Sequence, residues 1–463
     1  MSKRILPGLV LLVVAWGLWP SPLPAAQNDL AGWKAGVAKT VITPAKPMWM
    51  SGYASRNKPA EGKVHDLWAK ALVLQDPQGR RAALVTMDLV SIHRDLSLAV
   101  RDELQQKYGL DRAAVRLSCS HTHCGPLVGQ SLAAMFTGDE TQRQLVDEYA
   151  RTLHTKLVAV VGEAIQQLAP ARLSWGNGTA AFAVNRRNNK EAEVPKLRAA
   201  GQPLKGPVDH AVAVLAVHDG QDRPRAVVCG YACHATTLGF YQWCGDYPGF
   251  AQLNLEAAHP GAVALFWAGC GADQNPLPRR TVELAQDYGK QLSDAVEAVL
   301  RQPLKPIRGA FGASYIEVDL PFASVPDREQ LLKDRASTAR QIAARAKALL
   351  EQLEAKGAVS PTYPYPVQVW QLGPDLTWIA LGGEVVVDYA LRFKRELGPE
   401  RTWVAGYSND VTGYIPSARV LQEGGYEGGG AMVWYGLPSA WAPPVEDLVA
   451  AAVHDQVKKV RGR

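Results

Sequence analysis

The sequence contains few cysteines and no closely spaced cysteine pair. Six cysteines occur in 463 residues, and no two of them form a Cys-x-x-Cys pattern. Structural zinc clusters that use thiolate ligands depend on such pairs, so a cysteine-rich zinc cluster is not expected. An even number of cysteines in an exported protein permits disulfide bonds. The sequence leaves open whether any of the six is oxidised.

Long hydrophobic runs are also missing, apart from one at the N-terminus. A basic pair precedes an apolar stretch at residues 5–19, and small residues follow up to Ala26. This order is typical of an export signal, and the stretch is shorter than the roughly 20 residues of a membrane-spanning helix. We expect residues 1–26 to be a signal peptide that exports residues 27–463 to the periplasm, the cell surface or the medium. Pro24 suits the cleavage motif poorly, so an uncleaved anchor is the alternative.

A strong charge of one sign is absent as well. The net charge is +6 with 20% charged residues, and lysine and arginine form no long cluster. Nucleic-acid-binding proteins carry such clusters, so no nucleic-acid partner is expected. Internal repeats and low-complexity linkers are not found either. The simplest organisation is therefore one large domain.

Strand and helix patterns alternate along the chain. Strands are expected at residues 70–75 and 81–89 around a turn at Gly79, followed by a helix at 96–108 and a strand at 113–117. A strand–helix–strand order indicates a parallel crossover. Further expected elements are hairpins at 211–218 with 225–231 and 367–373 with 376–381, strands at 262–267, 306–320 and 403–407, and helices at 142–168, 281–301, 327–356 and 445–460. The predicted fold class is α/β, with a single large mixed-sheet domain, flanking helices and an active site at the strand carboxyl ends.

Residues that can bind a metal follow four of these expected strands. His121 and His123 come just after one strand and would point the same way on an extended backbone. Two such imidazoles can share a metal, or one can bind it while the other moves protons. His234 and Tyr414 follow two other strands, and Glu384 stands where a helix is expected to open. Taken singly, each also fits a structural role, such as a core histidine, a helix-start carboxylate or a buried phenol.

Taken in order, these motifs resemble those of the neutral/alkaline ceramidase family, zinc-dependent amidases that cut the N-acyl bond of ceramide. The similar stretches are Met-Ser-Gly-Tyr-Ala at 50–54, Ser-His-Thr-His-Cys-Gly-Pro at 120–126, Asn-Arg at 185–186, Cys-His-Ala-Thr at 233–236, Gly-Glu at 383–384, Gly-Tyr-Ile at 413–415 and Tyr-Glu-Gly at 426–428. They cover most of residues 35–440 in the family's order.

The resemblance implies a zinc site and a set of catalytic residues. One zinc ion per chain would be bound by His121, His234, Glu384 and Tyr414, a nitrogen and oxygen ligand set that suits zinc. Zinc would lower the pKa of a bound water to about 7. Tyr426, helped by Arg186, would donate to the developing oxyanion. His123 would carry a proton to the leaving amine.

The sequence departs from the family pattern in two places. Asp273 stands where the family has a serine implicated in catalysis, counting from the shared Asn275. We interpret Asp273 as a further catalytic candidate that orients the water, accepts its proton or binds a cationic substrate group; the alternative is a loop-capping aspartate. The chain also stops after the helix at 445–460, so the C-terminal immunoglobulin-like domain of many family members is expected to be missing.

The resemblance predicts a ceramidase-like, zinc-dependent hydrolase of an amide bond. Its substrate would be N-acylsphingosine or a related N-acyl lipid, cleaved to fatty acid and amine. An amphipathic amide or lipid is the expected partner, and peripheral membrane contact is compatible with it. One alternative is a metal-dependent hydrolase of a different amide or ester, with Asp273 in place of the family serine. Another is an exported binding protein that keeps the fold and the metal without catalytic activity.

Overall fold

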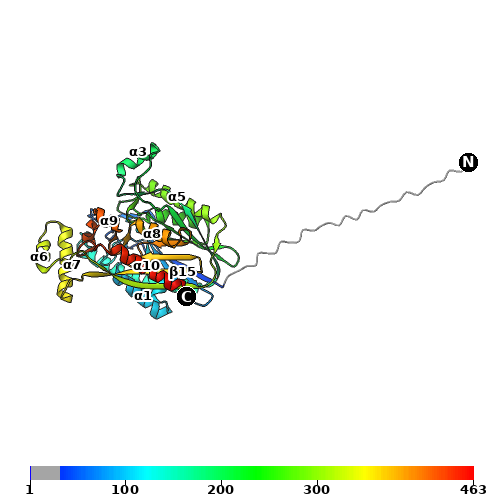
Figure 1. Cartoon of the computed structure of the whole chain (residues 1–463), viewed down its shortest axis with the longest axis horizontal. Coiled ribbons are helices and arrows are strands. Elements are labelled where there is room, and N and C mark those ends of the chain that lie inside the picture. The colour runs from blue at the N-terminus through cyan, green and yellow to red at the C-terminus, as the bar shows by residue number, and fades with distance from the viewer. Residues whose placement is uncertain (2–31, 463) are drawn as a thin grey trace.

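The computed structural model describes Met1 and residues 32–462 (Figure 1). The expected signal peptide lies almost wholly outside these residues, so the fold does not bear on it. Among the described residues, none of the helices has the length and apolar character needed to cross a membrane. All six cysteines are buried as free thiols.

The largest element of the fold is a nine-stranded mixed sheet in the order β11-β9-β8-β6-β1-β3-β4-β5, with β13 paired to β6. Its strands are β1 (Lys34–Val41), β3 (Trp68–Gln75), β4 (Arg81–Met87), β5 (Val115–Cys119), β6 (Ala169–Thr179), β8 (Ala211–Asp219), β9 (Pro224–Tyr231), β11 (Val263–Ala268) and β13 (Lys305–Pro306). The pairs β4–β5 and β9–β11 are parallel, and the other neighbours are antiparallel. The predicted crossover is confirmed, since α1 (Arg94–Tyr108) joins the parallel strands β4 and β5.

A second sheet, which the sequence did not predict as a separate unit, packs on the first. It contains β14 (Phe311–Pro321), β15 (Thr362–Leu372), β16 (Leu376–Leu381) and β18 (Thr402–Ala405) in that order. A hydrophobic core fills the space between the sheets, with Leu72 and Leu74 on one side and Trp378 on the other. Ala71 and Val73 point to the opposite face of β3, as the two-residue period of a strand requires.

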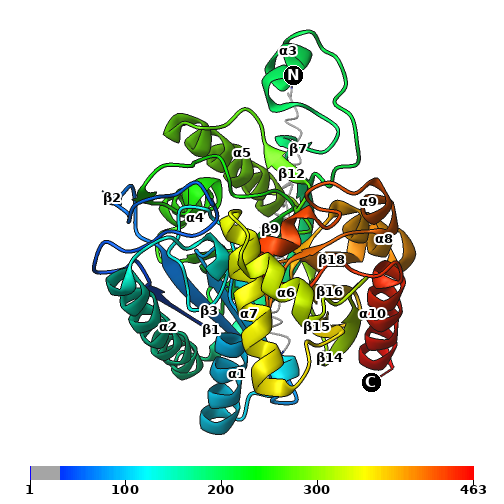
Figure 2. The same ribbon diagram turned by 90° about the vertical axis from the view of Figure 1, so that its left-hand side faces the viewer.

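Helices cover the outer faces of both sheets. On the large sheet these are α2 (Glu140–Gln166), α4 (Asp246–Ala258) and α5 (Val282–Leu300), and on the small sheet α8 (Val387–Leu397) and α10 (Val445–Arg461). Figure 2 shows this succession of layers, from α2 on the left to α10 on the right. Val449, Val453 and Val457 recur at helical spacing along α10 and pack onto the small sheet. The predicted α/β class with a large mixed sheet and flanking helices is therefore confirmed.

Two helix predictions need correction. The single helix expected at 327–356 is a hairpin of α6 (Arg328–Arg335) and α7 (Arg340–Lys356). Leu331 of α6 shares a small core with Leu349 and Leu350 of α7, and one straight helix could not bring these side chains together. The helix expected to open at Glu384 begins at Val387, because Glu384 itself lies in a short strand.

Short strand pairs, short helices and 3₁₀ turns connect the longer elements of the two sheets. They comprise β2 (Gly62–Lys63) with β10 (Gln242–Trp243), β7 (Ala183–Asn185) with β12 (Gln274–Pro276), β17 (Glu384–Val385) with β19 (Tyr414–Ile415), the helices α3 (Val194–Ala199) and α9 (Ala418–Glu423), and the 3₁₀ turns η1 (Arg112–Ala114), η2 (Ala133–Met135), η3 (Glu191–Glu193), η4 (Pro399–Arg401) and η5 (Gly430–Tyr435). Isolated bridges join Ser118 to Ser408 and Gly269 to Ala405, so the carboxyl ends of β5, β11 and β18 meet.

Candidate metal centre

The segment that carries His121 and His123 leaves its strand before the histidines. Strand β5 ends at Cys119, and His121 has a left-handed backbone with φ of 62°. The prediction that both histidines lie on an extended backbone is therefore wrong. The turn nevertheless brings Nε2 of His123 within 3.1 Å of Nε2 of His121. Gly52 lies against this turn, where a Cβ atom would stand 2.5 Å from Nδ1 of His123.

Backbone carbonyls fix the orientation of two of the imidazoles. Nδ1 of His121 donates to the carbonyl of Val90 at 2.7 Å, and Nδ1 of His234 donates to the carbonyl of Gly271 at 2.8 Å. A neutral imidazole with its proton on Nδ1 presents a lone pair on Nε2. Hydrogen bonds of this kind to the second nitrogen are typical of metal-binding histidines. Both Nε2 atoms are therefore prepared as metal ligands.

Glu384 lies opposite these two nitrogens. Strand β17 pairs in parallel with β19, which sets Glu384 beside Tyr414. Oε2 of Glu384 is 3.2 Å from Nε2 of His121 and 3.1 Å from Nε2 of His234. This oxygen is buried and accepts no hydrogen bond within the described structure. Two nitrogen lone pairs and an unpartnered carboxylate oxygen thus face one another.

The electrostatics of this group suit a bound cation. Burial lowers the pKa of His234 to about 4, with Arg186 acting in the same direction, so the imidazole is neutral near pH 7. Burial acts to raise the pKa of Glu384, but the facing imidazoles outweigh it and hold the pKa well below its usual range. Neutral imidazoles and an ionised carboxylate are the protonation states in which these groups bind metals. The donor set therefore fits a divalent ion with nitrogen and oxygen ligands, such as zinc.

Tyr414 and Arg186 border the same group. The hydroxyl of Tyr414 is 3.3 Å from Nε2 of His234. Arg186 donates from Nη2 to this hydroxyl at 3.0 Å, while its Nε donates to Glu427 at 2.7 Å. Burial raises the pKa of Tyr414 well above its usual value, and the Arg186 cation opposes this shift. Arg186 thus holds the phenol in place beside the histidines.

Tyr426 is the accessible member of the predicted set. Its side chain is 44% exposed, and its ring centroid lies 5.2 Å from that of the buried Tyr414. A cavity of about 490 Å³ opens next to Tyr426 and Arg186. Its other charged lining residues are Arg187, Arg279, Glu191, Glu423 and Glu427. The open space beside Tyr426 is therefore mostly polar and charged.

Asp273 lies in the loop after β11 and is fully buried. Its Oδ1 accepts from the backbone N–H of Val387 at 2.8 Å, and its Oδ2 accepts from Nδ2 of Asn185 at 3.2 Å. Burial raises the pKa of this carboxyl to about 6. Both oxygens are thus occupied by structural donors, and one of them caps the first turn of α8.

Some residues around the centre had no sequence signal that pointed to them. Tyr435 donates a hydrogen bond from its hydroxyl to Oε1 of Glu384. Arg56 donates to the carbonyl of His123 at 2.7 Å. Tyr53, by contrast, belongs to the motif at residues 50–54, although the motif did not indicate that its ring centroid lies 4.8 Å from that of His123. Single tyrosines and arginines far from the histidines in sequence give no indication that folding will bring them here.

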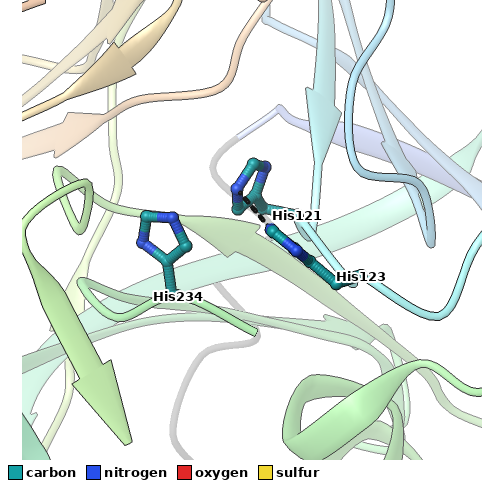
Figure 3. A group of neighbouring side chains, drawn as sticks. All are labelled: His121, His123 and His234. Atoms are coloured by element: carbon teal, nitrogen blue, oxygen red, sulfur yellow. Dashed lines mark hydrogen bonds between the residues drawn. The ribbon is translucent and has the colours of Figure 1, made fainter. Parts of the chain in front are cut away.

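The three histidines form a second possible ligand group. Ring nitrogens of His121, His123 and His234 lie within 4.8 Å of one another. Figure 3 shows that His121 and His123 come from one segment and His234 from another, with the imidazoles gathered in one place. The geometry alone therefore accommodates either two histidines with Glu384 and Tyr414, or three histidines.

Comparisons with known proteins bear on the site as a whole. A sequence model of the family described as neutral/alkaline non-lysosomal ceramidase, N-terminal, matches residues 33–266. The chain is 26% identical over 278 residues to neutral ceramidase 1 of Arabidopsis thaliana and 25% identical over 297 residues to neutral ceramidase A of Dictyostelium discoideum. Each match covers 58% of this chain but only 35% and 40% of those relatives. The chain thus spans well under two thirds of their length.

The fold also matches a solved structure. The crystal structure of neutral ceramidase from Pseudomonas aeruginosa has a TM-score of 0.71 to this chain, covering 93% of this chain and 75% of that one. The sequence identity is 20%, so this similarity shows the fold.

Proposed function

This chain belongs to the neutral/alkaline non-lysosomal ceramidase family, as its motifs predicted, and we propose on that premise that it is a zinc-dependent hydrolase of amide bonds. Its substrate is an N-acylsphingosine or a related N-acyl lipid, cleaved to fatty acid and amine. One observation carries the proposal: the Nε2 atoms of His121 and His234 lie 3.2 and 3.1 Å from the same unpartnered oxygen of Glu384.

We assign one zinc ion per chain to His121, His234, Glu384 and Tyr414. The hydroxyl of Tyr414 lies close enough to His234 to join this set, and Arg186 holds it there. A zinc ion bound here would supply Lewis acidity toward an amide carbonyl and toward water. His123 is kept outside the ligand set, because its Nδ1 lacks the carbonyl partner that orients the other two imidazoles.

The remaining residues act on protons and on the developing negative charge. Nε2 of His123 lies 3.1 Å from Nε2 of His121, so His123 stands beside the assigned ligands, close enough to move a proton there. Burial and the neighbouring imidazoles hold the pKa of His123 well below its usual value, so the imidazole is neutral near pH 7 and passes to the leaving amine a proton that it takes from water. Tyr426 lies at the open side and donates to the carbonyl oxygen as charge builds on it. Asp273 accepts hydrogen bonds from Asn185 and from the first turn of α8, and these bonds keep the two segments in place.

A second candidate is a hydrolase of a different, more polar amide or ester. The cavity beside Tyr426 favours it, because five of its lining residues in addition to Arg186 are charged. Two long hydrocarbon chains gain little from such a surface. Asp273, with both oxygens occupied, does not supply the hydroxyl of the family serine.

Metal analysis and a substrate panel test these proposals together. The purified protein is assayed for zinc, then given a fluorogenic N-acylsphingosine and a set of short polar amides and esters, with and without a chelator. Chelator-sensitive cleavage of the N-acylsphingosine supports the first candidate. Cleavage of short polar substrates alone would replace it with the second. Bound zinc without turnover of any substrate would favour a binding protein.

We also propose that the protein is exported and that residues 1–26 are removed. The proposal rests on the basic, apolar and small-residue order of that segment. N-terminal sequencing of the protein recovered outside the cytoplasm tests it, and an N-terminus at Gln27 is expected. An intact Met1 on a membrane-bound form would indicate an uncleaved anchor.

A further inference from the structure

The two oxygens of Glu384 have different surroundings. Oε2 faces His121 and His234 and accepts no hydrogen bond within the described structure. Oε1 accepts a hydrogen bond from the hydroxyl of Tyr435. The side chain as a whole is 3% exposed, so bulk water does not compete for either oxygen. One oxygen is therefore directed at the centre, and the other is held by a phenol.

Tyr435 is placed for this contact by a short, closely packed segment. It is the last residue of η5, which is flanked by Gly429 and by Gly436 in the left-handed region. Tyr435 packs with Val90, Leu132 and Met135, the group of apolar residues under η2. Val90 also supplies the carbonyl that orients His121. The same small cluster thus supports both a histidine and the carboxylate.

We propose that Tyr435 is a positioning residue of the zinc site, which holds Oε1 of Glu384 so that the carboxylate offers the ion a single oxygen. This inference rests on the proposed zinc site. A carboxylate that turns both oxygens toward an ion uses two coordination positions. A hydrolytic zinc site needs a position left open for water or substrate. By restraining Oε1, Tyr435 limits Glu384 to one position.

The test compares two variants that each lose one phenol hydroxyl. Tyr435→Phe removes the contact to Glu384 and keeps the ring. Tyr149→Phe is the matched control, because its buried hydroxyl donates to the carbonyl of Ile42 in the core under α2. The zinc dissociation constant is measured by competition with a chelator. The cobalt-substituted protein is then examined by absorption spectroscopy, which reports coordination number.

We expect Tyr435→Phe to weaken zinc binding about 10- to 100-fold, as loss of a hydrogen bond to a ligand usually does. Its cobalt spectrum should shift toward a higher coordination number. Tyr149→Phe should keep the zinc affinity and spectrum of the parent protein, even if its melting temperature falls. Equal zinc affinity and an unchanged cobalt spectrum in Tyr435→Phe would overturn the inference. A parent protein that binds no zinc would instead overturn the proposed function, so the two failures are distinguishable.

If Tyr435→Phe folds poorly, Tyr435→His provides a second measurement. A histidine at this position can donate from its ring to the same carboxylate oxygen. Zinc affinity that is partly restored relative to Tyr435→Phe supports the inference. If zinc affinity instead falls together with the melting temperature of each variant, whether or not its side chain can donate a hydrogen bond, the inference is contradicted.

Discussion

Nε2 of His234 lies 3.1 Å from Oε2 of Glu384, and the hydroxyl of Tyr414, 180 residues from His234 in the sequence, lies 3.3 Å from the same nitrogen. His234 follows a strand of the large sheet, whereas Glu384 and Tyr414 follow strands of the small sheet. The candidate zinc site therefore forms only where strand ends of the large sheet meet strand ends of the small sheet.

His234→Ala should abolish both zinc binding and activity. The variant leaves the Glu384 carboxylate without one of its two facing nitrogens, and we expect a loss of zinc affinity beyond the roughly 10- to 100-fold typical of outer-shell changes. Zinc content is measured by elemental analysis. His259→Ala is the control, since His259 is paired with Glu297 at the end of α4. Full zinc content in His234→Ala would refute the assigned ligand set.

His123→Gln should separate the two possible ligand groups. If His123 moves protons and is not a ligand, the variant keeps one zinc per chain while kcat falls about 10²- to 10⁴-fold. Zinc content and turnover are measured on the same preparation. Loss of zinc together with activity would favour the three-histidine group.

Tyr426→Phe should lower kcat without affecting stability. Its hydroxyl is the accessible donor at the open side of the centre, and loss of one oxyanion donor typically lowers kcat about 10²- to 10³-fold. Because the side chain is 44% exposed, the free energy of unfolding should change by less than about 0.5 kcal/mol. Steady-state kinetics and urea unfolding check the two parts. An unchanged kcat would remove Tyr426 from the catalytic group.

Gly52→Ala should disturb His123 and lower activity. Gly52 has φ of 100°, and a Cβ atom there would lie 2.5 Å from Nδ1 of His123. Gly79→Ala is the matched control, because Gly79 has φ of 82° with no atom within 4 Å of such a Cβ. Both variants should lose about 1 kcal/mol of stability from the positive φ. Only Gly52→Ala should lose activity, and equal activities would show that the turn tolerates the methyl group.

Asp273 should make stability depend on pH. Its pKa is raised by burial from 3.8 to about 6, so the folded state binds the proton more tightly than the unfolded chain does. The contribution of Asp273 to the unfolding free energy is therefore largest below pH 4 and is lost as pH rises through about 6. Relative to Asp273→Asn, the parent protein should lose about 1–3 kcal/mol of unfolding free energy between pH 4 and 7.

Urea unfolding at several pH values measures this effect. Asp327→Asn is the matched control, because Asp327 caps α6 at the surface in the way that Asp273 caps α8 in the interior. It should keep the pH dependence of the parent protein. If Asp273→Asn and Asp327→Asn changed the pH dependence of the unfolding free energy equally, that dependence would not arise from Asp273.

Asp273→Ser should keep its zinc and shift substrate preference. Failure of this variant to fold would favour the capping role alone.

The sequence by itself determined the class of fold and the identity of the family. Apolar residues form an unbroken run at residues 71–74 of β3 and recur at helical spacing along α10, and such local patterns indicate strands and helices. The ordered motifs at residues 120–126, 233–236 and 383–384 likewise identified the family.

Only the tertiary structure decided how those pieces meet. A strand pattern does not state which edge it pairs with, so the small sheet and the fold of α6 back onto α7 were not predictable. The left-handed backbone of His121 depends on the neighbours that enclose the turn, since it costs about 1–2 kcal/mol on its own. The hydrogen bond from Tyr435 to Glu384 likewise has no local signal. Such contacts join residues distant in sequence, and only the packing of the two sheets brings them within reach.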